Sequence, residues 1–347
     1  MSYISFQPKD YFNTKLWTGT GSSNAITGVG FQPDWVWIKN RSATESHRIH
    51  DAVRGTNKSI SSDTNSSQTT TTQDVMSFDS DGFTLGTETA VNANGQNIVG
   101  WNWKANGQGS SNTDGSINTT YTSVNTTSGF SISTYSGTGS DGTIGHGLGV
   151  APKMVIVKSL TSTSYWMVYH ASLGNDKEIY LNQANAEGSS TTWNTTTPTS
   201  SLISLDGGAG NGVNASGESY VCYAFAEKKG FSKFGSYIGN NDFDGTFVYT
   251  GFKPAFVIVK HYLVGSRNWT MLDNKRSSSG GGNPNDKWIY ANENEAEANQ
   301  ASNPTDFLSN GFKLRSNAGY TNNGSYIYMA FAEEPLVSSN GIPAVAE

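Results

Sequence analysis

The strongest constraint on the fold is a ten-residue pattern that the chain contains three times. It reads GFQPDWVWIK at Gly30–Lys39, GVAPKMVIVK at Gly149–Lys158 and GFKPAFVIVK at Gly251–Lys260. Each copy has a Gly, a Pro three residues later, and then a run of aromatic and β-branched residues that ends in Lys. Pro has no N–H for a ladder and favours the first position of a strand, while Gly favours the turn before it. The pattern therefore predicts the same strand three times.

Both faces of each predicted strand are apolar. Side chains alternate between the two faces along a strand, so Trp35 and Trp37 share one face while Val36 and Ile38 share the other. The other two copies alternate in the same way. A strand that is apolar on both faces is covered on both sides, so each copy is expected to be the central strand of a β unit. The predicted core residues are Trp35, Trp37, Ile156, Val157, Ile258 and Val259.

Further segments recur in the same order around each copy. HRIHD at His47 matches WMVYH at Trp166 and WTMLD at Trp269, and each unit ends in a second apolar run. The spacing is not constant, since 149−30 is 119 and 251−149 is 102. A stacked solenoid would keep its period, so separate units with variable loops fit better. We predict an all-β chain of three tandem antiparallel β-sandwich domains, jelly-roll or lectin-like, at residues 1–105, 129–229 and 230–336, with a linker at 106–128 and a tail at 337–347.

Charge and composition exclude several classes of partner. The net charge is −6 and no basic patch is visible, so nucleic-acid binding is not expected. The sequence has no apolar run of transmembrane length and its first residues lack the features of a signal peptide, so we expect synthesis in a cytoplasm and no membrane insertion. Cys222 stands alone within a predicted strand, where it is expected to be a small buried side chain without a disulfide partner.

No set of residues in the sequence predicts catalysis or a cofactor. His47 and His50 are three residues apart in a predicted strand and face opposite ways, which argues against a shared metal. The strings Asp79–Gly82 and Asp242–Gly245 have the carboxylate spacing that calcium loops use, but neither continues into a full loop. Plain Asp-Gly turns are expected there, with calcium as the alternative. The predicted catalytic, cofactor and metal sites are therefore none, and the chain is not expected to be an enzyme.

Four aromatic residues are candidates for contact with a ligand or receptor. Trp193 lies within SSTTWNTTTPTS, and Tyr165, Tyr262 and Tyr320 lie at predicted loop edges in similarly polar company. An exposed ring among such residues can stack on a sugar or anchor a protein contact. The alternative is that each ring folds back over the edge of its own domain.

Several longer segments resemble a known family. The run SYISFQPKDYFNTKLWTGTGS from Ser2, followed by HDAVRG, SFDSDGFTLG and WNWKA, resembles a domain of unknown function that is widespread in marine bacteriophages. The domain occurs in virion proteins that are often described as tail-fibre or structural proteins. The resemblance covers the first two units strongly and extends into the third through GFKPAFVIVK and YMAFAEE. It implies a β-sandwich module on a virion, and it supplies no catalytic residue.

The expected function follows from this resemblance. We expect a non-enzymatic virion protein, assembled in the host cytoplasm and exposed on the particle, that acts as a tail-fibre or tail-associated adhesin. A capsid decoration or head-fibre protein is the alternative, and a glycan depolymerase ranks third. The expected partners are other virion proteins, further copies of the chain in a homo-oligomer such as a trimer, and a host-surface glycan or protein.

Overall fold

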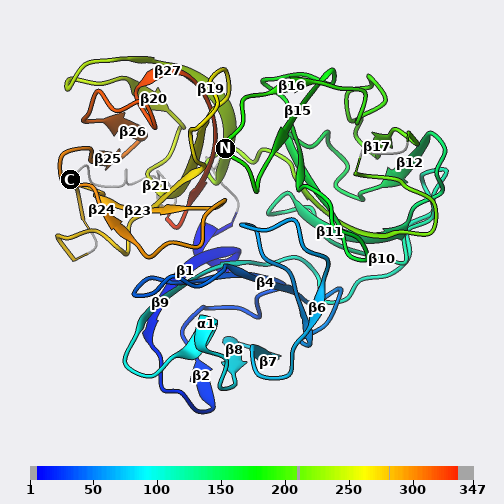
Figure 1. The fold of residues 1–347 in the computed structure, drawn as a ribbon, viewed down its shortest axis with the longest axis horizontal. Helices are drawn as coiled ribbons and strands as arrows, with labels where there is room; N and C mark the ends of the chain where they lie inside the picture. Colours follow the sequence, from blue (N-terminus) through cyan, green and yellow to red (C-terminus); the bar gives the residue numbers. More distant parts are fainter. Residues whose placement is uncertain (1–5, 209–211, 281, 335–347) are drawn as a thin grey trace.

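The three predicted strands are β3 (Trp35–Asn40), β13 (Met154–Ser159) and β21 (Pro254–His261). The computed structural model describes residues 6–208, 212–280 and 282–334, and nearly all of its regular structure is antiparallel β-sheet. Figure 1 shows three lobes around a common centre, each formed by a continuous stretch of sequence. The predicted all-β class and sandwich-like organisation are confirmed.

Each lobe is a sandwich of one main sheet and one small sheet, which we call the first, second and third sandwich in chain order. The first has the main sheet β1 (Phe12–Thr18), β9 (Asn97–Trp103), β3 and β4 (Arg48–Asp51), and the small sheet β2 (Asn24–Ile26), β8 (Gly82–Leu85) and β7 (Val75–Asp79). It also contains η1 (Pro8–Asp10), the β5 (Lys58–Ser59) and β6 (Thr69–Thr70) pair, and the short helix α1 (Thr89–Asn92).

The second and third sandwiches repeat the strand order of this main sheet and add further strands at its edges, and the small sheet of the second has two strands. The second has the main sheet β10 (Tyr121–Asn125), β11 (Phe130–Ser136), β18 (Ser219–Phe225), β13, β14 (Met167–His170), β15 (Lys177–Tyr180) and β16 (Gly188–Ser189), and the small sheet β12 (Gly142–Gly145) and β17 (Leu202–Leu205). The third has the main sheet β19 (Ser232–Asn240), β27 (Asn323–Ala332), β21, β22 (Thr270–Asp273), β23 (Lys287–Tyr290) and β24 (Ala298–Asn299), and the small sheet β20 (Phe247–Tyr249), β26 (Gly311–Leu314) and β25 (Thr305–Leu308).

The two faces of each central strand pack against different partners. Val36 and Ile38 face the small sheet of their own sandwich, where they pack with Phe83 and Leu85. Val155 and Val157, and Val257 and Val259, face the small sheets of the second and third sandwiches in the same way. The predicted core residues are all at most 1% exposed: Trp35, Trp37, Ile156, Val157, Ile258 and Val259. The prediction that each strand is covered on both sides is therefore correct.

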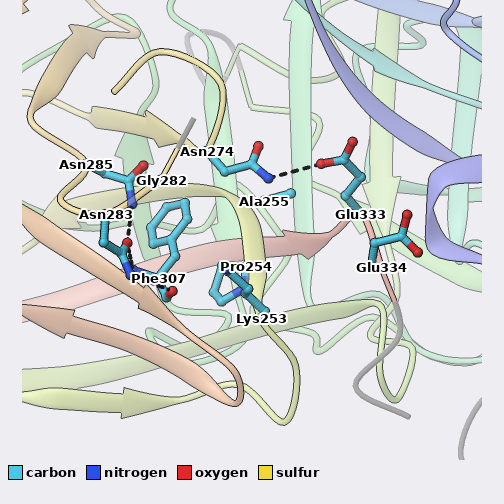
Figure 2. Close-up of a pocket in the computed structure, with 10 residues that line it drawn as sticks. All are labelled: Lys253, Pro254, Ala255, Asn274, Gly282, Asn283, Asn285, Phe307, Glu333 and Glu334. Carbon is cyan, nitrogen blue, oxygen red and sulfur yellow. Dashed lines mark hydrogen bonds between the residues drawn. The ribbon is translucent and has the colours of Figure 1, made fainter. Parts of the chain in front are cut away.

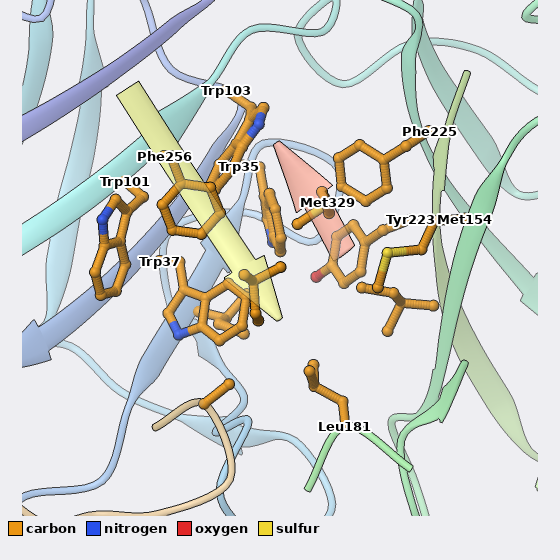
Figure 3. Packing of buried hydrophobic residues seen from close by; sticks show 14 of the residues in the cluster. Trp35, Trp37, Trp101, Trp103, Met154, Leu181, Tyr223, Phe225, Phe256 and Met329 are labelled. Atoms are coloured by element: carbon orange, nitrogen blue, oxygen red, sulfur yellow. The ribbon is translucent and has the colours of Figure 1, made fainter. Parts of the chain in front are cut away.

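The inner faces of the three main sheets meet in one hydrophobic cluster. Trp35 and Trp37 of β3 share it with Ile156 of β13 and with Phe256 and Ile258 of β21. Figure 3 shows Trp35, Trp37 and Phe256 close together, with Tyr223 and Phe225 of the second sandwich beside them. Tandem sandwiches with separate cores do not describe this arrangement, because one face of every central strand is covered by its neighbours.

The predicted linker at 106–128 belongs to the second sandwich. Its last part forms β10, which pairs along its whole length with β11, from Tyr121 opposite Thr134 to Asn125 opposite Phe130. Its first part is fixed to β10 by a hydrogen bond from Asn106 N to Ser123 Oγ (2.8 Å). The end of the segment is therefore an edge strand, and its first part is tied to that strand. The predicted tail at 337–347 lies outside the described residues.

Equivalent hydrogen bonds join each sandwich to the next and close the ring. A ring nitrogen at the start of the β4, β14 or β22 region contacts a main-chain carbonyl of the neighbouring sandwich: His47 Nε2 to Tyr290 O (3.1 Å), Trp166 Nε1 to Ser61 O (3.0 Å) and Trp269 Nε1 to Tyr180 O (2.9 Å). A second set joins main-chain groups: Glu297 N to Arg41 O (3.0 Å), Gln68 N to Leu160 O (3.0 Å) and Glu187 N to Tyr262 O (2.8 Å). The three junctions are therefore built on one plan.

Candidate functional site

The buried ionic groups of the ring have structural partners. Arg54 Nε lies 2.6 Å from Asp51 Oδ2, and Arg276 Nε lies 2.6 Å from Asp273 Oδ2. Arg276 also contacts Glu297 at 2.8 Å, and the same carboxylate binds Arg41. These carboxylates are occupied by guanidinium groups at the sandwich junctions, which is a structural arrangement.

The lysine that ends each copy of the repeated strand is fully buried. Burial lowers the pKa of Lys39 and Lys158 to about 8 and that of Lys260 to about 7. Each ammonium group donates to the carbonyl of the next residue, at 2.6 Å for Lys39, 2.7 Å for Lys158 and 2.8 Å for Lys260. Catalysis would need one such amine, whereas this lysine occurs at the same position of every sandwich. Its recurrence indicates a structural role, in which the amine hydrogen-bonds the main chain at the end of the strand.

The Asp-Gly turns use their carboxylates within the protein. The two oxygens of Asp81 accept hydrogen bonds from Gly28 N (2.8 Å) and Gly30 N (2.7 Å), which lowers its pKa. Asp242 Oδ1 accepts from Asp244 N (2.8 Å), and Asp244 Oδ1 lies 2.8 Å from Lys313 Nζ. Within the described residues, no group of three or more His, Cys, Asp or Glu side chains is placed to hold a metal ion. The geometry is that of plain turns.

Tyr165 is the predicted contact residue that the structure leaves most open. Its side chain is 45% exposed and its ring stacks on that of Tyr180 at 4.7 Å between centroids. The Tyr180 hydroxyl donates to Glu178, and burial together with this carboxylate raises the pKa of Tyr180. Tyr180 is therefore fixed by Glu178 and supports one face of the Tyr165 ring, while the other face is exposed to solvent.

Each ring of this pair lines a polar pocket. One, of about 640 Å³, is bordered by Tyr180 and by carboxyl and hydroxyl groups: Asp176, Glu178, Ser189, Ser190, Thr191 and Thr195. The other, of about 380 Å³, includes Tyr165 itself, Glu218 and residues of the loop that precedes Tyr165. An exposed aromatic ring at a pocket rich in hydrogen-bonding groups suits a polar ligand with an apolar face.

The other three candidates are less accessible. Trp193 is fully buried, with its ring 5.9 Å from that of Tyr169 in the outer core of the second sandwich, so it is not available to a ligand. The ring folds back over its own domain, which corrects its assignment as a contact residue. Tyr262 is partly buried against the central cluster. Tyr320 is also partly buried, and its ring contacts Tyr290 (5.7 Å) and Arg267 (5.3 Å).

Three further exposed aromatic residues were not predicted from the sequence. Phe243, Phe247 and Tyr249 of the third sandwich are 63%, 42% and 60% exposed. The signal was present in the repeats, because TFVYTG in the third unit corresponds to NAITGV in the first. The aromatic residues take positions where the first unit has small or hydroxyl side chains.

A pocket of about 240 Å³ lies where β21 and β27 meet the β25 region (Figure 2). Glu333 at its rim accepts from Asn274 Nδ2 (3.0 Å) and pairs with Lys275 Nζ (2.7 Å). Glu334 lies 3.5 Å from Lys9 Nζ. Both carboxylates thus have partners, and they are not arranged as the free acid and base that face each other across a cleft in glycoside hydrolases.

The fold and surface together define an all-β protein of three sandwiches around one core, with its open aromatic rings on the outside. Residues 7–335 match the family described as "Domain of unknown function (DUF7483)", and the chain belongs to this family. A comparison with curated proteins gives no match. No helix in the described part of the chain is long and apolar enough to cross a membrane.

Proposed function

We propose that this chain is a non-enzymatic bacteriophage virion protein, a tail-fibre or tail-associated adhesin that contacts the host surface. The observation that carries the proposal is the contrast between interior and exterior aromatic residues. Eight of the nine tryptophans are buried, whereas Tyr165, Phe243, Phe247 and Tyr249 are 42–63% exposed. Exposed aromatic side chains are the groups that most often anchor binding surfaces.

The architecture supports an attachment role. The ionic groups at the sandwich junctions and the buried lysines serve the ring, which leaves the outer loops and the exposed positions of the small sheets to vary without loss of the core. We propose that the protein is made and assembled in the host cytoplasm, is displayed on the virion surface, and is joined there to other virion proteins.

The test is direct binding to host cells. Fluorescently labelled protein is expected to bind saturably to cells that the phage infects and to compete with virions for adsorption. A variant with Tyr165→Ser, Phe247→Ala and Tyr249→Thr is expected to lose most of this binding, and Met76→Thr, which changes another exposed apolar residue, serves as the control. Absence of binding by the unchanged protein contradicts the adhesin.

Two other functions give different results in simple measurements. A capsid decoration protein would be present at hundreds of copies per particle, against tens for a fibre, and gel densitometry of purified virions distinguishes them. A depolymerase would release reducing sugar from host polysaccharide. We place it third because the carboxylates of the pocket in Figure 2 are paired.

A further inference from the structure

Strand β20 of the third sandwich carries two aromatic side chains on its outer face. Phe247 and Tyr249 are exposed, while Val248 between them is buried against the main sheet. Side chains two apart on a strand point the same way and are separated by about 7 Å along it. The two rings therefore form one row, which we call the β20 face.

The corresponding strands of the other sandwiches show that this row is not a requirement of the fold. Val248 pairs with Phe312 of β26, as Ile26 pairs with Phe83 of β8 and Ile144 with Ile203 of β17. The positions that flank these three buried residues are Phe247 and Tyr249 in the third sandwich, Ala25 and Thr27 in the first, and Thr143 and Gly145 in the second. The same sandwich is thus built twice without aromatic residues at these positions.

The neighbouring strand leaves room for the rings. Gly311 of β26 is opposite Tyr249, and a Cβ at Gly311 would lie 2.9 Å from the Cε2 and Cζ atoms of Phe247. The Phe247 ring therefore extends over the glycine backbone. A Cβ there would also lie 2.2 Å from Val248 O, so the main chain of β20 requires the glycine as well as the ring does. This packing keeps the ring against the sheet and presents its other side outward.

Ion pairs border the β20 face. Lys313, opposite Phe247 in the register, lies 2.8 Å from Asp244, and Arg315 Nε lies 2.6 Å from Asp306. Two cations and two carboxylates supply hydrogen-bond donors and acceptors around the rings without a net charge. Such a border fits a ligand that carries many hydroxyl groups and no charge.

We propose that the β20 face binds a neutral glycan chain. This names the ligand class for the proposed attachment function and rests on it. A sugar ring offers a C–H face for Phe247 and Tyr249 and hydroxyl groups for the charged border. At 42% and 60% exposure the two side chains offer roughly 150–250 Å², well below the ~800 Å² per partner of a stable protein interface, so a second copy of this chain is a poor fit.

The test measures binding of purified full-length protein to a neutral glycan array and, in solution, to laminarin, dextran and the acidic polysaccharide alginate. We expect at least one neutral glycan to bind. The Phe247→Ala/Tyr249→Thr variant, which introduces the residues of the first sandwich, is expected to weaken that binding at least tenfold. Its melting temperature should match that of the unchanged protein, and Met76→Thr, at an exposed apolar residue of the first sandwich, is the control that should bind as the unchanged protein does.

Each contrary result overturns the inference. These are an absence of binding to every neutral glycan, a preference for alginate, equal binding by the double variant, or self-association in analytical ultracentrifugation that the double variant abolishes. Cell binding separates the inference from the function. Cell binding without glycan binding overturns the ligand class and leaves the adhesin, whereas glycan binding without cell binding does the opposite.

Discussion

The Tyr223 hydroxyl of the second sandwich donates a hydrogen bond of 2.7 Å to Asp51 Oδ2 of the first. The first and third sandwiches are joined in the same way, by Trp101 Nε1 and Asp273 Oδ2 at 2.9 Å. At the remaining junction the acid is replaced by His170, whose Nε2 lies 3.2 Å from a main-chain carbonyl of β27. Two of the junctions around the common core therefore contain a buried carboxylate, and one contains an uncharged imidazole.

Removing the Tyr223 hydroxyl tests whether the junctions stabilise the fold. Tyr223→Phe leaves the buried Asp51 carboxylate with one donor fewer, so the free energy of unfolding is expected to fall by about 1–2 kcal/mol. Tyr165→Phe, at an exposed ring, is the matched control and should change it by less than about 0.5 kcal/mol. Urea denaturation measures both, and equal effects would show that the junction hydrogen bond contributes nothing.

A larger effect is expected where a buried charge loses its partner. Arg276→Leu leaves the buried Asp273 without a guanidinium partner and Glu297 with Arg41 alone, so we expect a loss of about 3–5 kcal/mol in unfolding free energy. The second sandwich has His170 and Leu173 at the matching positions. The double variant Asp273→His/Arg276→Leu should therefore be more stable than the single variant in the same urea titration. A double variant that is less stable than the single one would contradict this explanation.

The strands and their faces could be predicted from sequence because their signal is local. Alternation in Trp35–Ile38 and its counterparts shows that both faces are buried, and both are. What covers each face is not local information. An apolar inner face has the same sequence whether its own sheet or a neighbouring sandwich covers it, so the shared core was not predicted.

The site residues show the same limit. Trp193 has polar neighbours in sequence, but the chain turns back at Asn194 and Thr195, both with positive φ, and the indole packs under its own polar tract. Phe247 and Tyr249 were missed for the opposite reason. Their alternation with Val248 is typical of any strand, and only comparison with the Ala25 and Thr27 positions shows that they are unusual.

The closed ring leads to a prediction about oligomeric state. The family resemblance led us to expect a homo-oligomer such as a trimer. In the structure each sandwich already binds its two neighbours through equivalent contacts such as Trp166 Nε1 to Ser61 O and Trp269 Nε1 to Tyr180 O. We therefore expect light scattering after size-exclusion chromatography to give the 37.2 kDa of one chain. A mass near three times this value would support the trimer instead.

The buried lysines predict a rise of stability with pH. Burial lowers the pKa of Lys260 from 10.5 to about 7 in the folded state. Below pH 7 both states carry the proton; above it the folded state loses the proton first, so the unfolded state binds more protons and stability increases with pH. The slope is at most about 1.4 kcal/mol per pH unit for one lysine. Burial raises the pKa of Tyr135, which reverses the trend only above about pH 10.

The measurement is urea denaturation at pH 7, 8 and 9. The unchanged protein is expected to gain stability over this range, with Lys39 and Lys158 adding to the gain above pH 8. Lys260→Met removes the contribution of Lys260, so the unfolding free energy of this variant should rise less steeply with pH. The difference between its stabilities at pH 7 and pH 9 should be the smallest of the three proteins. Lys153→Met, at an exposed lysine in the second sandwich, should keep the slope of the unchanged protein. Equal slopes for all three proteins would show that burial of the charged Lys260 side chain does not destabilise the folded state.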